Sequence, residues 1–378
     1  MAAGPGNPPN FLTKPLGEHH ISRSMLICLR TPPECRGGDC LSPHSFCENL
    51  MAKAKRIKGI KCDEVAALGM RRVLQTRFDE MYGFREAALD WSDPEGVHSM
   101  RVASRRLRSA MRDFMPYLRQ RGLSSVLKET KNIAATLGEV RDQDVAIMAL
   151  EKLEKQSSPA VAAALKLLID DRKELRNASR DKLNSVLVTD DMSDIRSEFM
   201  LRVEEATALR KSRDQGKSRG PGNSHGSGKS HETQLTYSKM SAVVILDRLK
   251  ELEKLSDGLY KPFDIEPLHD MRIAAKRLRY AMELFQQCWG RSLLIHAKQA
   301  ARLQTALGEV HDCDVWIENL GKRINDARKQ KQEEHIAAFI WLLSHFVKIR
   351  TKHLRQAYDL WREWETTDVS GQVRHAVR

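Results

Sequence analysis

The chain contains the same helical unit twice. The segment VHSMRVASRRLRSAMRDF at 97–114 aligns without gaps on LHDMRIAAKRLRYAMELF at 268–285, and ten of the eighteen positions are identical. A second pair, TLGEVRDQDVAIMAL at 136–150 and ALGEVHDCDVWIENL at 306–320, keeps nine of fifteen. The two pairs are offset by 171 and 170 residues, so they indicate one duplicated unit rather than two chance matches.

Each unit consists of segments with helical periodicity. In the first half they cover about 62–90, 94–120, 123–155 and 160–186, with short connections that favour antiparallel neighbours. No series of alternating Val-, Ile- and Thr-rich segments indicates a sheet. We therefore expect an all-α protein with two four-helix bundles, the first at 62–205 and the second at 235–366.

Two segments outside the bundles have the composition of flexible chain. Residues 1–50 are rich in Pro, Gly, Ser and Cys without apolar periodicity, which predicts a disordered leader. Its four acids count against an organellar transit peptide. Residues 206–234 contain a Gly-, Ser- and Lys/Arg-rich stretch and are predicted to be a flexible basic linker.

The seven cysteines do not form a recognisable pattern. No secretory leader precedes them, and Cys28, Cys35, Cys40 and Cys47 lack close Cys-x-x-Cys pairs. We interpret these four as free thiols and expect a reducing compartment.

The overall charge indicates the kind of partner. Lys and Arg number 63 against 50 Asp and Glu, a formal net charge of +13. No stretch approaches the roughly 20 apolar residues that span a bilayer, so we expect no membrane segment. Aromatic residues make up only 6%, which argues against a binder that stacks many bases on exposed rings. A polyanion is the favoured partner.

Both copies of the first motif place basic residues beside the apolar stripe of a helix. Asp93, Pro94 and Glu95 are typical of a helix start, and the residues after them alternate with helical spacing. The first basic row consists of His98, Arg101, Arg105, Arg108 and Arg112; the second consists of His269, Arg272, Lys276 and Arg279. An anionic ligand would offset the repulsion within each row, and so would acids on neighbouring helices, for which Glu139, Asp142 and Asp144 are candidates.

The histidines and aspartates of the motifs have several interpretations. His98 and His269 fit either phosphate donation or packing in the first helical turn; no second ligand stands four residues away to support a metal site. The pairs Asp142/Asp144 and Asp312/Asp314 point apart on a continuous helix. We expect one Asp to cap a helix that restarts after Gly138 or Gly308, and the other to pair with Arg106 or Arg277. No catalytic motif such as GxxxxGK[ST], GxSxG, HExxH or ExExK occurs.

These motifs, His98-x-x-Arg101-Val102-x-x-Arg105-Arg106-Leu107-Arg108 with Leu137-Gly138-x-x-Arg141-Asp142-x-Asp144-Val145 and their second copy, resemble those of the CHAD family, the conserved histidine α-helical domain. The resemblance covers about 62–366. It implies two bundles related by a pseudo-twofold axis and a basic surface that binds inorganic polyphosphate without catalysis; metal chelation by the histidines is a further suggestion for such domains. Lys276 and His311 depart from the family pattern, since each stands where the motif has Arg.

We therefore expect a non-enzymatic polyphosphate-binding protein without a cofactor or metal. Nucleic-acid binding, with RNA and other polyanions as partners, and a metal-dependent phosphohydrolase are the alternatives. The predicted binding residues are the two basic rows together with neighbouring bases, namely His98, Arg101, Arg105, Arg106, Arg108, Arg112, Lys128, His269, Arg272, Lys276, Arg277, Arg279, Lys298 and Arg302.

Two further expectations concern titration and location. The histidines should strengthen polyphosphate binding below about pH 7, because an unperturbed imidazole has a pKa near 6.5. The basic run from Lys53 to Lys61 favours nuclear import, with the cytoplasm as the alternative, or else it forms the solvated start of a helix.

Overall fold

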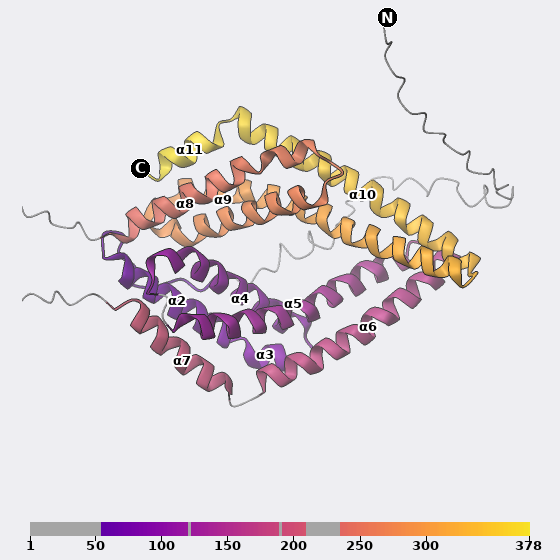
Figure 1. Ribbon diagram of the computed structural model, residues 1–378, viewed down its shortest axis with the longest axis horizontal. Helices are drawn as coiled ribbons and strands as arrows, with labels where there is room; N and C mark the ends of the chain where they lie inside the picture. Colours follow the sequence, from indigo (N-terminus) through magenta and orange to yellow (C-terminus); the bar gives the residue numbers. More distant parts are fainter. Residues whose placement is uncertain (1–53, 120–121, 189–190, 209–234) are drawn as a thin grey trace, which may run out of the picture. The chain divides into compact units, whose positions relative to one another are not determined.

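Helices account for nearly all of the secondary structure in the computed structural model, which describes residues 54–119, 122–188, 191–208 and 235–378 (Figure 1). The first half contains α2 (Ala66–Tyr82), α3 (Arg85–Leu89), α4 (Pro94–Phe114), the 3-10 turn η2 (Met115–Tyr117), α5 (Leu123–Glu154), α6 (Pro159–Leu187) and α7 (Asp191–Ala206). The second half contains α8 (Tyr237–Lys254), the 3-10 turn η3 (Ser256–Tyr260), α9 (Ile265–Lys329), α10 (Glu333–Thr366) and α11 (Val369–Ala376). These residues form no strand, so the prediction of an all-α fold is confirmed.

The predicted start of α4 has the expected capping geometry. The Asp93 carboxylate accepts a hydrogen bond from the backbone N–H of Glu95 at 2.8 Å, and Pro94 occupies the first helical position. The acid at Glu95 meets the positive end of the helix dipole. The sequence therefore fixes where this motif-bearing helix begins.

The apolar stripe of each motif helix is buried as its spacing predicts. On α4 it consists of Val97, Met100, Ser104, Leu107, Met111 and Phe114. On α9 it consists of Leu268, Met271, Ala275, Leu278, Met282 and Phe285. Because the stripes face inward, the neighbouring basic rows lie at the margin of the core.

The hydrophobic core near the motif helices is shared by the two halves. One cluster contains buried residues of α2 and α4 together with residues of α8 and α9. Phe285 of α9 contacts both Phe114 of α4 and Tyr237 of α8, with ring centroids 6.1 and 5.6 Å away. A second cluster joins α5 and α6 to the later parts of α9 and α10. The boundaries of two separate bundles and their origin in a duplication therefore stay predictions.

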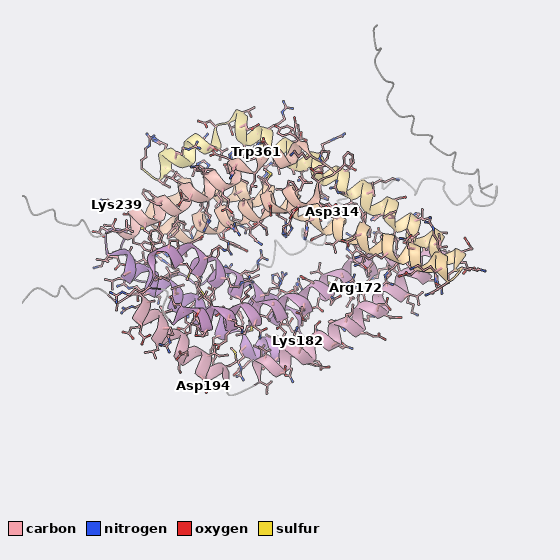
Figure 2. All side chains as sticks on the ribbon, viewed as in Figure 1. Arg172, Lys182, Asp194, Lys239, Asp314 and Trp361 are labelled. Atoms are coloured by element: carbon pink, nitrogen blue, oxygen red, sulfur yellow. A yellow bond between two sulfur atoms is a disulfide. The ribbon has the colours of Figure 1, made fainter. Side chains whose placement is uncertain are left out.

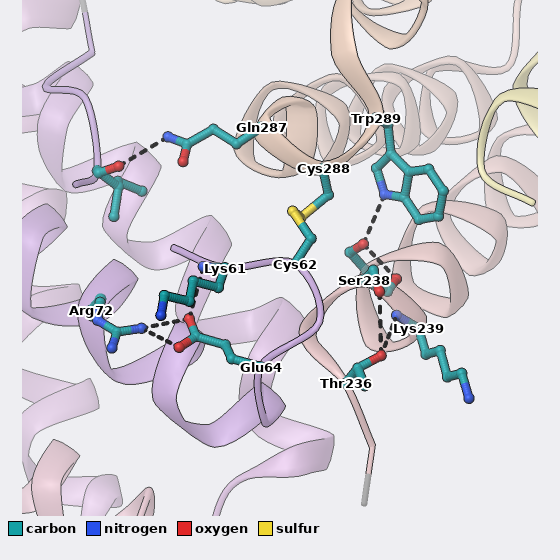
Figure 3. Close-up of a disulfide and its surroundings, with 12 residues drawn as sticks. Lys61, Cys62, Glu64, Arg72, Thr236, Ser238, Lys239, Gln287, Cys288 and Trp289 are labelled. Carbon is teal, nitrogen blue, oxygen red and sulfur yellow. Dashed lines mark hydrogen bonds and ion pairs between the residues drawn. A yellow bond between two sulfur atoms is a disulfide. The ribbon is translucent and has the colours of Figure 1, made fainter. Parts of the chain in front are cut away.

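The segments that enter the two halves pair with each other. Residues Val65 and Thr236 form an isolated antiparallel bridge, flanked by hydrogen bonds from the Ala66 N–H to the Leu235 carbonyl and from the Tyr237 N–H to the Glu64 carbonyl. A disulfide joins Cys62 to Cys288 of α9 beside this bridge, across 226 residues (Figure 3). The expectation of a reducing environment did not anticipate this bond. Cys62 and Cys288 are far apart in the sequence, so no spacing pattern predicts the bond. Only the fold brings the two cysteines together.

Helix α9 breaks at a different place from the one predicted. Gly290 has φ 73° and ψ −157°, a conformation that only glycine adopts without strain, and it kinks the helix there. Helix α5 runs without a break past Gly138, and α9 is likewise helical at Gly308. The predicted helix restarts at these glycines, with Asp as the cap, are therefore wrong.

Several predicted segments lie wholly or partly outside the described residues. These are the leader at 1–50 with its four cysteines, Lys53, and the linker beyond residue 208. The rest of the basic run, from Lys55 to Lys61, is not helical, so the helix-start interpretation is wrong. Its backbone is held at Lys55, whose N–H donates to Glu80 Oε1 at 3.0 Å, and Ile57 is buried. The nuclear location stays a prediction.

Candidate functional site

The two basic rows meet at one aromatic ring. Helices α4 and α9 pack against each other, and Tyr280 of α9 lies between cations of both rows. The Arg105 guanidinium carbon is 5.7 Å from the Tyr280 ring centroid, and that of Arg279 is 5.8 Å away. Both distances fit cation–π contacts. The rows therefore belong to a single region, which the sequence did not indicate.

We call five cations of this region the cationic cluster: Arg105, Arg108 and Arg112 of α4 with Arg272 and Lys276 of α9. Each is partly buried. Burial lowers the pKa of Arg108, Arg112 and Arg272 in the first place, and neighbouring arginines lower them further. For Lys276, burial and then Arg105, Arg272, Arg112 and Arg108 lower the pKa to about 7. Asp312 and Asp142 act in the opposite sense on Arg272, and Asp113 does so on Arg112, so carboxylates offset this concentration of positive charge only in part.

In the described residues, carboxylates form ion pairs with cations at the margins of the rows, but not with four of the five cluster cations. Arg101 pairs with Asp142 of α5 at 2.9 Å, as the sequence allowed for a neighbouring helix. Arg279 pairs with Glu283 on its own helix at 2.7 Å. Within the described part of the chain, no carboxylate forms an ion pair with Arg105, Arg108, Arg112 or Lys276. These four cations are the ones left available to an anionic ligand.

The first arginine of each Arg-Leu-Arg sequence has a carboxylate partner on the preceding long helix. Arg106 pairs with Glu80 of α2 at 3.0 Å, and Arg277 pairs with Glu251 of α8. The predicted pairing with the aspartates is therefore wrong. Asp144 lies 3.8 Å from Arg176 instead. Asp314, which is labelled in Figure 2, accepts from Arg350 Nε of α10 at 2.5 Å. Sequence reasoning missed these partners because they are long-range.

The motif histidines are packed rather than exposed. His98 is buried. His269 contacts His311, with their Nδ1 atoms 3.2 Å apart, so one ring donates and the other accepts. Burial and then Arg272 lower the pKa of both rings, that of His311 to about 4. The assumption of an unperturbed pKa is wrong for His269, because burial and then Arg272 lower its pKa.

The more distant predicted bases are divided between two places. Lys128 and Lys131 line a cavity of about 430 Å³ together with Arg108 and Arg112, which extends the cluster onto α5. Lys131 was not predicted. Arg302 lines another cavity, of about 290 Å³, with bases of α10 and pairs with Glu363 at 3.4 Å. Lys298 is exposed on α9.

The described residues contain no cluster suited to a metal ion and no membrane-spanning helix. No three His, Cys, Asp or Glu side chains there are arranged to hold a metal ion. None of the helices in these ranges has the length and apolar character of a membrane span.

The geometry defines an all-helical protein with paired basic motif helices that share one cluster. The family model of the CHAD domain matches residues 72–321, and the chain belongs to this family. A crystal structure of the CHAD domain from the plant Ricinus communis is similar, with a TM-score of 0.59 and 19% identity over 81% of this chain and 96% of that one. PptA from Streptomyces chartreusis has a TM-score of 0.57 and 13% identity over 79% and 100%. Comparison with curated proteins gave no significant match.

Proposed function

We propose that this chain binds inorganic polyphosphate through the cationic cluster and does not chemically transform it. The observation that carries the proposal is the set of four cations, Arg105, Arg108, Arg112 and Lys276, that lack a carboxylate partner in the described residues. Membership of the CHAD family supports it. Four of the five cluster residues, Arg105, Arg108, Arg272 and Lys276, belong to the two copies of the motif that resembles this family.

A linear polyanion fits this arrangement better than a compact one. The cations come from successive turns of α4 and from the facing turns of α9, and Lys128 and Lys131 continue the series. Guanidinium groups donate two hydrogen bonds to phosphate oxygens in a planar fork, which suits a repeating phosphate chain. Binding a ligand with one negative charge per phosphate unit would reduce the mutual repulsion of the cations in the cluster.

Such binding depends on salt. Each phosphate that a cation neutralises releases counterions, with a log–log slope of about −0.7 per contact on a single-stranded polyanion. Six contacts predict a slope of roughly −4 between affinity and salt concentration. A ligand held by shape or apolar contacts would give a much smaller slope.

A charge-matched pair of variants tests the proposal. Changing Arg105, Arg108 and Arg112 together to Gln removes three cations at the cluster, and changing Lys322, Arg328 and Lys329 removes three exposed cations near the end of α9. We expect the first variant to lose at least about tenfold in polyphosphate affinity, since hydrogen bonds to charged groups contribute about 1.5–3 kcal/mol each. The control should change much less. Equal losses would mean that only net charge matters, and would contradict the assigned site.

Two further arms separate the alternatives. Competition between polyphosphate and RNA at fixed salt tests nucleic-acid binding, because a nucleic-acid protein would retain RNA. Phosphate release from polyphosphate in the presence of Mg²⁺ or Mn²⁺ tests the phosphohydrolase. Release above the background of the cluster variant would contradict the non-enzymatic proposal.

A further inference from the structure

Lys276 is the only primary amine of the cationic cluster. It is half-buried on α9, one turn after Arg272, and the charged groups that act on it are Arg272 of its own helix and Arg105, Arg108 and Arg112 of α4. No carboxylate in the described residues pairs with it. Its family counterpart is an arginine, which has no comparable nucleophilic form. This chain therefore combines an amine with four neighbouring guanidinium groups, the groups to which the proposed function assigns phosphate binding.

We propose that Lys276 is an acylation site whose donors are small acyl phosphates. The guanidinium groups of the cluster bind the phosphate dianion of the donor, which brings the carbonyl carbon to the lysine Nζ. The nitrogen lone pair attacks this carbon, a C–N bond forms, and the C–O bond to phosphate breaks. Inorganic phosphate leaves and the extra proton on nitrogen passes to solvent, so no oxidant or reductant is needed.

The protonation state of the amine favours this reaction. With a pKa of about 7, most Lys276 side chains are neutral at pH 7.5. An ordinary lysine has a neutral fraction roughly 700-fold smaller at this pH. Lower basicity also reduces nucleophilicity, by roughly 40-fold if the Brønsted slope resembles that of thiols. The net advantage is about 20-fold before any recruitment by the arginines.

The neighbouring cations also stabilise the reaction itself. Negative charge develops on the carbonyl oxygen in the transition state, and a guanidinium that is already in place stabilises it without reorganisation. A neutral acyl donor also reacts faster with this amine than with an ordinary lysine, but it carries no phosphate for the arginines to bind. A bound polyanion favours the charged form of the Lys276 amine, whereas acylation makes this nitrogen permanently neutral, so it weakens the cluster as a polyanion site.

The acetylation rate of each lysine tests the proposal directly. Full-length protein is treated with acetyl phosphate at pH 7.5, and the acetylation rate of each lysine is followed by peptide mass spectrometry. We expect Lys276 to react at least tenfold faster than Lys298, an exposed lysine of the same helix. The rate at Lys276 should level off above about pH 7.5, because the pKa of this amine is about 7. A Lys276 rate equal to or below that of Lys298 overturns the proposal.

Variants test the role of the arginines. Arg105→Gln should slow acetylation of Lys276 several-fold, because it removes both a phosphate-binding group and a charge that keeps the amine neutral. Lys322→Gln, an exposed change on the same helix, should have no effect. Phenyl acetate serves as the neutral donor. If it shows the same preference for Lys276 as acetyl phosphate does, recruitment of phosphate is excluded and the donor class is wrong.

Acylation of Lys276 goes beyond the proposed function, and separate experiments can contradict polyphosphate binding and acylation. Polyphosphate affinity of untreated protein tests the function alone. For the acylation, affinity is compared before and after acetyl phosphate in wild type and in Lys276→Arg. We expect treatment to reduce the affinity of the wild type several-fold and to leave that of the variant unchanged. An equal reduction in both proteins would assign the effect to other lysines.

Discussion

Removal of the Glu80 carboxylate should strongly destabilise the protein, because this acid is buried and has more than one partner. Glu80 is the shared partner of two arginines: Oε2 lies 2.5 Å from Arg77 Nη1, and Oε1 lies 3.0 Å from Arg106 Nη1. The Lys55 N–H also donates to Oε1, at 3.0 Å. Glu80→Ala leaves two guanidinium groups and one backbone donor without this acceptor.

The magnitude follows from burial. The Glu80 side chain is 4% exposed, and those of Arg77 and Arg106 are 8% and 14% exposed. Removing one partner of a buried ion pair costs about 3–5 kcal/mol, because the remaining charge stays away from water. For a folded region of this size, about 1 kcal/mol corresponds to roughly 1.5 °C in Tm, so the expected decrease is about 5–7 °C.

The second half supplies a matched control. Glu251 accepts from Arg248 at 3.1 Å and also pairs with Arg277, but its side chain is 26% exposed. Because water can solvate the arginines there, Glu251→Ala should cost only about 1 kcal/mol. Denaturant unfolding followed by circular dichroism gives both values. If Glu80→Ala costs no more than Glu251→Ala, burial does not determine the difference and the reasoning is refuted.

Two further predictions concern pH and oxidation state. The folded-state pKa of His311, about 4, lies below the unfolded value, so the unfolded chain binds more protons and stability falls as pH decreases from about 6.5 towards 4. His311→Gln should make this dependence shallower in unfolding measured between pH 4.5 and 7.5, and identical slopes would contradict the assignment. Breaking the disulfide with Cys288→Ser should cost up to about 5 kcal/mol, because the bond closes a very long loop in the unfolded chain. The melting temperature of the wild type should fall in dithiothreitol and that of the variant should not; a wild type insensitive to the reductant would mean that the bond adds no stability.

Local and periodic features of the fold were predictable from the sequence. The helix start at Asp93 depends on residues next to each other, and the stripe from Val97 to Phe114 depends on the repeat of the α-helix. Both are properties of one segment and need no knowledge of its neighbours. The position of the basic rows beside the core follows from the same periodicity.

The relations between segments were not predictable. The sequence shows Arg105 and Tyr280 on separate motif copies, and only the packing of α4 on α9 brings them to 5.7 Å. The same holds for Glu80 with Arg106 and for Cys62 with Cys288. His269 was interpreted by itself, although its environment includes His311 and Arg272. A pKa depends on such neighbours, which explains why the unperturbed value was wrong.

The pairing of the two entry segments has a consequence for synthesis on the ribosome. Ala66, at the start of α2, donates to Leu235, and Phe114 of α4 packs against Phe285. These partners are translated more than 150 residues later, as the residue numbers show. Until they emerge, the nascent first half exposes the apolar faces of α2 and α4, which are the surfaces that chaperones recognise. Productive folding of this chain is therefore completed late in translation, when α9 closes the core that the first half leaves open.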